Sequence, residues 1–91
     1  MATANFNIQP QDGWVEITTA GVNFIRIHQY PETHPFYVTT GSLTPAATVR
    51  GYRVDCAEFW CNVPVADKFY VRTTNPKPDL PLRIDVFYVL T

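Results

Sequence analysis

Apolar and polar residues alternate along most of this chain with a period of two. The clearest example is the run LRIDVFYVLT, in which one side carries Leu82, Ile84, Val86 and Tyr88 and the other carries Arg83 and Asp85. Successive side chains of a β-strand point to opposite faces, so this alternation is typical of a strand with one buried face. The chain shows no convincing 3.6-residue period of an amphipathic helix, and Pro45–Thr48 has room for one helical turn at most.

Seven or eight short strands are predicted, separated by segments rich in glycine, proline, asparagine and aspartate. They are expected near residues 4–9, 14–19, 22–29, 35–40, 48–55, 57–62, 67–73 and 82–90. Such strands indicate an all-β fold, a single small antiparallel β-sandwich over residues 1–91, and their spacing leaves jelly-roll and Ig-like topologies both open. The expected core consists of residues on the apolar faces of these strands: Ile17, Ile25, Ile27, Val71, Ile84 and Val86.

The first eleven residues favour two interpretations equally. Asparagine and glutamine surround only two large apolar residues, Phe6 and Ile8, before Pro10. Residues 1–11 are therefore expected either as an N-terminal arm that pairs with the sheet edge of a neighbouring chain or as the first strand of the domain itself.

Composition narrows the range of functions. The 91 residues are 46% hydrophobic, 14% aromatic and only 16% charged, and the net charge is -1. A protein that coats nucleic acid concentrates lysine and arginine, so no nucleic-acid partner is expected. No apolar run approaches the roughly 20 residues of a membrane-spanning helix, and MATANFNIQPQDG lacks the pattern of a signal peptide. We therefore expect a soluble protein with no membrane partner, whose two cysteines are reduced thiols.

Histidine and cysteine pairs form the candidate metal site, His28 with His34 and Cys56 with Cys61. Zinc takes four such ligands. Cys56 and Cys61 are five positions apart, however, and on one regular strand they would point to opposite faces. Free cysteines and no cofactor are therefore expected, while a turn between the two cysteines would keep the zinc alternative open.

Catalytic patterns are weak. No local sequence resembles a nucleophile motif, the glycines form no phosphate-binding loop, and the acidic residues are scattered singly. The sequence therefore predicts a protein that is not an enzyme and has no catalytic residues.

The aromatic residues suggest contacts with partners or with carbohydrate. Trp60 is expected in the sandwich interior, whereas Trp14 follows a turn and is expected at an edge or interface. The proline-bounded loop from Tyr30 to Tyr37 is the best candidate for an exposed binding loop. The predicted partner-binding residues are Phe6, Ile8, Trp14, Tyr30, Phe36 and Tyr37.

Four segments carry a resemblance to a known class of protein: DGWVEITTAGVNFIRI, FYVTTGSLTPAATVRGYRVD, DKFYVRTTN and LRIDVFYVLT. Together they resemble small all-β virion structural proteins of tailed bacteriophages, in particular capsid decoration and accessory proteins of the head. The resemblance implies a non-enzymatic protein that is assembled in the host cytoplasm into the virion in many copies. It also implies binding to the major capsid protein or another virion protein.

The resemblance does not separate a head protein from a tail, neck or fibre component. We expect a homo-oligomeric decoration, or cement, protein that stabilises the head. The alternative is a carbohydrate- or receptor-binding β-sandwich module of a phage tail, fibre or spike. Copy number separates the two, because a shell needs hundreds of copies and a tail needs a dozen or fewer.

Overall fold

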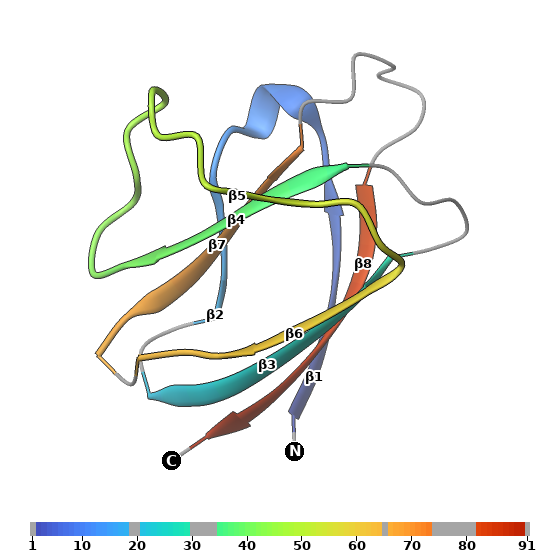
Figure 1. Ribbon diagram of the computed structural model, residues 1–91, viewed down its shortest axis with the longest axis vertical. Helices are drawn as coiled ribbons and strands as arrows, with labels where there is room; N and C mark the ends of the chain where they lie inside the picture. The colour runs from blue at the N-terminus through green and yellow to red at the C-terminus, as the bar shows by residue number, and fades with distance from the viewer. Residues whose placement is uncertain (1, 19–20, 30–34, 65, 74–81, 91) are drawn as a thin grey trace.

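The computed structural model describes residues 2–18, 21–29, 35–64, 66–73 and 82–90. These residues form eight strands and one short 3₁₀ helix (Figure 1). The elements are β1 (Ala2–Ile8), η1 (Pro10–Asp12), β2 (Val15–Thr18), β3 (Val22–Gln29), β4 (Phe36–Gly41), β5 (Tyr52–Val54), β6 (Glu58–Asn62), β7 (Lys68–Thr73) and β8 (Leu82–Leu90). The all-β prediction is confirmed, and each predicted strand is present, although β5 is shorter than expected. In this described part of the chain, no helix is long and apolar enough to span a membrane.

The strands form two four-stranded antiparallel sheets, β1-β8-β3-β6 and β2-β7-β4-β5. Each strand of the first half pairs with its counterpart in the second half: β1 with β8, β2 with β7, β3 with β6 and β4 with β5. An immunoglobulin-type sandwich instead pairs its first strand with its second. The observed order, a long hairpin folded over on itself, is that of a jelly roll. It decides between the two topologies that strand spacing left open.

The core lies between the two sheets and contains the six residues predicted from the apolar faces of the strands. Register places the apolar phases of neighbouring strands together, as in the pairing of Ile27 with Val86 on adjacent β3 and β8. Burying a side chain of this size stabilises a fold by about 1.5–3 kcal/mol. The predicted core residues are all buried: Ile17, Ile25, Ile27, Val71, Ile84 and Val86.

The N-terminal arm is not confirmed, because its residues form the first strand of the sandwich. β1 pairs with β8 of the same chain from Ala2 opposite Tyr88 to Ile8 opposite Leu82. Ile8 is 1% exposed, and Phe6 packs against the core beside it. The polar residues that suggested an arm occupy alternate, solvent-facing positions of the strand. The second interpretation of residues 1–11 is therefore the one observed.

The two tryptophans lie opposite to expectation. Trp60, predicted in the interior, is 60% exposed, and Trp14, predicted at an edge or interface, is only 8% exposed. Trp60 belongs to the edge strand β6, where Phe59 and Cys61 take the inward phase and pack against the core. Strand alternation then directs Trp60 outward, because neighbouring side chains point to opposite faces.

Part of the outer face of the second sheet is covered by the loop between β4 and β5. The loop between β4 and β5 approaches Trp14 so closely that a Cβ added at Gly51 would lie 2.5 Å from the indole. The Arg72 side chain lies 5.0 Å above the Trp14 ring and donates a hydrogen bond of 2.9 Å to the carbonyl oxygen of Ala47. Tyr70, two residues before Arg72 on the same face of β7, is also buried. The loop thus covers the Trp14 and Arg72 side chains on this face.

Candidate functional site

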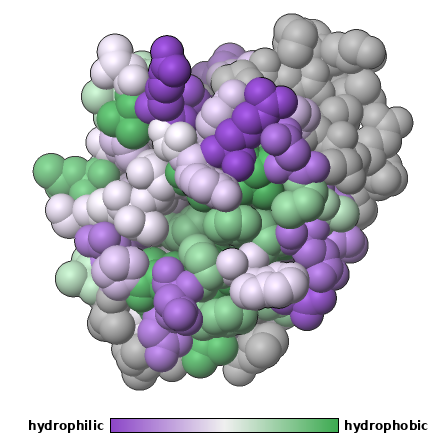
Figure 2. All heavy atoms as spheres, in the orientation of Figure 1, coloured by the Kyte–Doolittle hydropathy of each residue, from purple (hydrophilic) through white to green (hydrophobic). Residues whose placement is uncertain are grey.

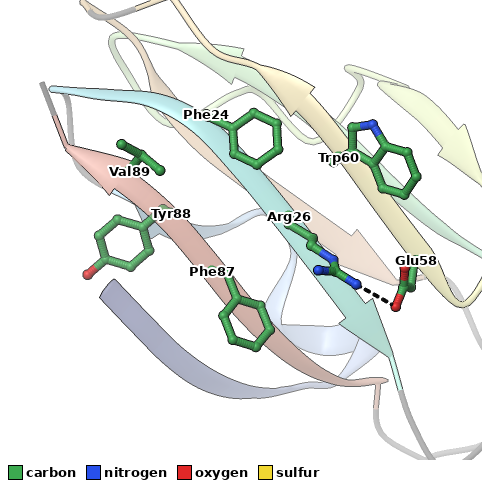
Figure 3. A pocket seen from close by; sticks show the side chains of 7 residues that line it. All are labelled: Phe24, Arg26, Glu58, Trp60, Phe87, Tyr88 and Val89. Atoms are coloured by element: carbon green, nitrogen blue, oxygen red, sulfur yellow. Dashed lines mark hydrogen bonds and ion pairs between the residues drawn. The ribbon is translucent and has the colours of Figure 1, made fainter. Parts of the chain in front are cut away.

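A hollow of about 560 Å³ lies on the outer face of the first sheet, which we call the Trp60 hollow (Figure 3). Three strands supply its walls, so it depends on the pairing of β6, β3 and β8. Its lining residues are Phe24, Arg26, Glu58, Trp60, Phe87, Tyr88 and Val89.

Strand register sets the arrangement of the side chains in the Trp60 hollow. Arg26 on β3 lies opposite Trp60 on β6 and, on its other side, opposite Phe87 on β8. Directly opposed residues of neighbouring strands have Cβ atoms about 5 Å apart, so two aromatic side chains flank one guanidinium. Two residues away along β3, Phe24 lies opposite Val89 and adds an apolar wall. Figure 3 shows Arg26 between Trp60 and Phe87.

An exposed ion pair forms the polar part of the Trp60 hollow. The Nη2 atom of Arg26 donates a hydrogen bond of 2.8 Å to Oε1 of Glu58. The two side chains are 48% and 42% exposed, so water screens the pair and its contribution to stability is at most about 1 kcal/mol. His28, next on the outward phase of β3, lies opposite both Glu58 and Asp85. The ion pair therefore contributes little to stability, and its exposed groups can form hydrogen bonds with a ligand.

A second hollow, the β5–β6 cleft, opens between the edge strands of the two sheets. Its volume is about 530 Å³, and Figure 2 shows apolar surface gathered between these strands. Side chains of both sheets line it, and Tyr52 lies across the cleft from Phe59 with ring centroids 6.2 Å apart. The residues that line it are Val38, Thr39, Thr40, Gly51, Tyr52, Phe59, Cys61 and Phe69.

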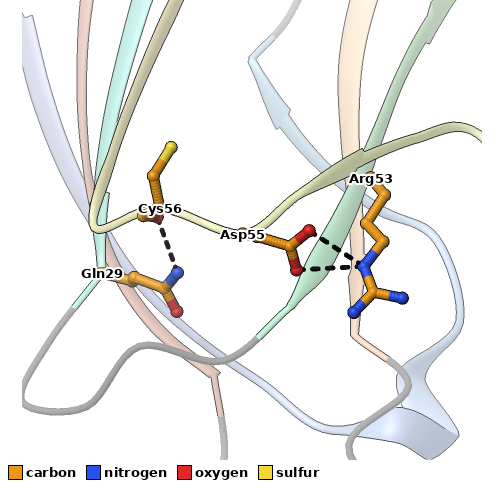
Figure 4. A network of polar contacts seen from close by, with 4 residues as sticks. All are labelled: Gln29, Arg53, Asp55 and Cys56. Atoms are coloured by element: carbon orange, nitrogen blue, oxygen red, sulfur yellow. Dashed lines mark hydrogen bonds and ion pairs between the residues drawn. The ribbon is translucent and has the colours of Figure 1, made fainter.

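A polar network holds the connection that separates β5 from β6 (Figure 4). The side-chain Nε2 of Gln29 donates to the carbonyl oxygen of Cys56 at 2.9 Å, and the Gln29 backbone N–H donates to that of Ala57 at 2.9 Å. Nearby, Nε of Arg53 lies 3.0 Å from Oδ1 of Asp55. That hydrogen bond and the carboxylate charge raise the pKa of Arg53 above its ordinary value. The two Gln29 hydrogen bonds attach the connection between β5 and β6 to the end of β3.

The two cysteines are free and differ in their surroundings. Cys56 lies in the turn before β6, is exposed, and donates through Sγ to the carbonyl oxygen of Glu58. Cys61 lines the β5–β6 cleft, and its partial burial raises the pKa of its thiol. His28 lies on the opposite, outer face of the sheet, and His34 lies outside the described residues. Over the described ranges, no three histidine, cysteine, aspartate or glutamate side chains gather as a metal site would require.

The predicted partner-binding residues lie mostly inside the fold. Ile8 and Phe36 are core residues, and Phe6 is partly buried and packs against the core. Trp14 and Tyr37 meet around one cation, since the Arg72 guanidinium carbon lies 5.0 Å and 5.9 Å from their ring centroids.

Tyr30 lies outside the described residues. For Phe6, Ile8, Trp14, Tyr30, Phe36 and Tyr37 alike, contact with a partner stays a prediction.

Sequence reasoning missed the Trp60 hollow, although a signal for it is present. Phe24 shares the outward phase of β3 with Arg26 and His28, and Phe87 shares that of β8 with Asp85. Large aromatic residues in a phase otherwise occupied by charged ones indicate an exposed apolar surface. Comparisons with protein-family models, curated proteins and solved structures find no match to this chain.

Proposed function

We propose that this chain is a non-enzymatic structural protein of a tailed-bacteriophage virion. In this proposal many copies decorate the head and bind the major capsid protein or another virion protein. The resemblance of its strand segments to small virion proteins supports this role. The jelly-roll strand order is compatible with it, because that architecture serves viral capsid proteins as well as lectins.

One observation carries the binding part of the proposal: an apolar cleft lies beside a sheet edge. β6 is the last strand of its sheet, paired with β3. Edge strands present unpaired backbone groups that can accept a further strand. On the inward side of β6, Phe59 and Cys61 open into the β5–β6 cleft, with Phe69 contributed by the other sheet. An extended segment of a neighbouring virion protein would pair with β6 and place alternate side chains in the cleft.

Quantitative mass spectrometry of purified virions tests the structural role. The proposal predicts this chain at hundreds of copies per particle, beside the major capsid protein. A dozen copies or fewer would favour the alternative, a carbohydrate- or receptor-binding module of a tail, fibre or spike. The exposed Trp60 hollow is the observation that favours this alternative.

The two free thiols allow a matched test of the β5–β6 cleft. In a Cys56→Ser variant, a bulky maleimide attached to Cys61 occupies the cleft and should prevent binding to virions assembled without the chain. In the control, Cys61→Ser, the same label sits on exposed Cys56 and should leave binding intact. Equal binding by both labelled proteins, with equal melting temperatures, would contradict strand addition at β6.

A further inference from the structure

We propose that the Trp60 hollow binds a neutral saccharide. In this site a sugar ring stacks on the exposed aromatic side chains, and its hydroxyl groups bond to Arg26 and Glu58. The hollow lies on the outward side of β6, whereas the β5–β6 cleft lies on its inward side. The saccharide site is therefore separate from the surface assigned to virion assembly, and each proposal can fail alone.

Flat apolar surface is the first requirement for a sugar site, and this face of the sheet supplies it. Trp60 on β6 is 60% exposed, and Phe24 on β3 and Phe87 on β8 are partly exposed. Aromatic ring faces carry partial negative charge, and the C–H groups on the face of a sugar ring carry partial positive charge. Stacking therefore buries apolar area and is electrostatically favourable. The hollow, at about 560 Å³, falls within the range of about 300–1,000 Å³ usual for small-molecule sites.

Hydrogen-bonding capacity is the second requirement, and the ion pair between the aromatic walls has capacity to spare. A guanidinium has five N–H donors, and a carboxylate offers about four acceptor positions. Among the described residues, one hydrogen bond links the two groups, from Nη2 of Arg26 to Oε1 of Glu58. A hydroxyl group both donates and accepts, so adjacent hydroxyls of one sugar can bond to the two side chains together.

Charge complementarity selects a neutral ligand. In the described part of this face, two arginines, Arg26 and Arg83, are balanced by two carboxylates, Glu58 and Asp85. A ligand with net charge would therefore gain little attraction overall. An apolar protein segment would cover the Arg26–Glu58 pair without replacing its hydrogen bonds to water, which costs free energy. A polyhydroxylated ligand replaces those bonds, so it fits the hollow better than an apolar segment does.

The second sheet provides an internal comparison. Its outer face also carries a tryptophan and an arginine, Trp14 and Arg72, but the loop between β4 and β5 covers them. The indole, guanidinium and carboxylate of the Trp60 hollow have no such cover among the described residues and remain open to a ligand.

The test is a titration of the full chain followed by ¹H–¹⁵N correlation spectra, which report two indole N–H signals. The probes are the methyl glycosides of glucose, galactose and mannose, and N-acetylglucosamine, each raised to tens of millimolar. At least one should shift the Trp60 signal in a saturable way and leave the buried Trp14 signal unchanged. Trp60→Ala and Arg26→Met should each weaken binding about tenfold or more, followed on the neighbouring backbone amides. Leu43→Ala removes another exposed apolar side chain, one that lines neither the Trp60 hollow nor the β5–β6 cleft, and should leave the affinity unchanged.

Three results would overturn the proposal. The first is the absence of any saturable shift with these four probes. The second is a shift with glucuronate or glucosamine alone, because it would show that the face selects charge. The third is a Trp60 signal that moves with protein concentration in the absence of sugar, because a second copy of the chain would then occupy the hollow. The melting temperatures of Trp60→Ala and Arg26→Met are measured as a control. If they are unchanged, a loss of binding is due to the site and not to unfolding.

Discussion

At the scale of single residues, the face of the strand on which a side chain lies determines how much its removal lowers the free energy of unfolding. Ile84 is fully buried, whereas its neighbour Arg83 is exposed. Truncating Ile84 to alanine removes buried methyl groups and leaves a cavity between the sheets, so it should lower the free energy of unfolding by about 2–4 kcal/mol. Arg83→Ala, the control, should change it by less than about 0.5 kcal/mol. Urea unfolding measures both, and similar small losses would show that the register of β8 is wrong.

At Gly51, both the backbone conformation and the lack of space for a side chain favour glycine. Its φ is +76°, and an added Cβ would lie 2.5 Å from the Trp14 ring and 2.8 Å from the carbonyl oxygen of Val38. Gly21 also has a positive φ, of +100°, but nothing lies within 4 Å of an added Cβ. Both alanine variants incur the backbone cost of about 1–2 kcal/mol, and only Gly51→Ala adds a steric clash.

We therefore expect Gly51→Ala to lower the melting temperature clearly more than Gly21→Ala does. It should also change the near-ultraviolet circular dichroism of buried Trp14, since the loop over the second sheet must move. Equal melting temperatures would mean that the loop does not pack against Trp14.

At the scale of elements, β1 is the strand for which the structure decides between two interpretations. Its seven residues pair with β8, and Ile8 is part of the core. Deleting residues 1–9 should therefore abolish cooperative unfolding, because β8 loses a neighbour and the core loses apolar cover. Circular dichroism during thermal unfolding measures this. The double variant Thr3→Ala, Asn7→Ala changes only exposed positions of β1 and should keep its transition. A truncated chain with an unchanged melting temperature would restore the arm interpretation.

At the scale of the whole molecule, the nested pairing order makes most contacts distant in sequence. Residues 2–8 pair with residues 82–88, and β2 pairs with β7. The chain loses the entropy of closing these long loops before the contacts between the strands stabilise the fold. Folding should therefore be slow, on the order of milliseconds to seconds. A Trp60→Phe variant leaves buried Trp14 as the fluorescent reporter for stopped-flow measurements. Folding in microseconds would be incompatible with this topology.

Strand positions and core residues follow from local patterns. Where apolar and polar residues alternate along a strand, the apolar ones face the core whichever strand lies beside them. Ile25, Ile27 and Ile84 are predicted in the core for this reason, and all three are buried. The Trp60 hollow is harder to predict from the sequence. Its aromatic residues Phe24 and Phe87 stand in outward phases, a visible signal, but their meeting with Trp60 requires the order β8-β3-β6.

The sequence by itself determined the strands, their buried faces and the all-β class, because these depend on residues close together along the chain. Only the tertiary structure decided which of two tryptophans is exposed. Trp60 faces solvent since β6 is an edge strand with its inward phase occupied, and Trp14 is buried since a loop distant in sequence folds over it. The tertiary structure likewise decided that residues 2–8 belong to the sheet, because their pairing partner, β8, lies at the other end of the sequence.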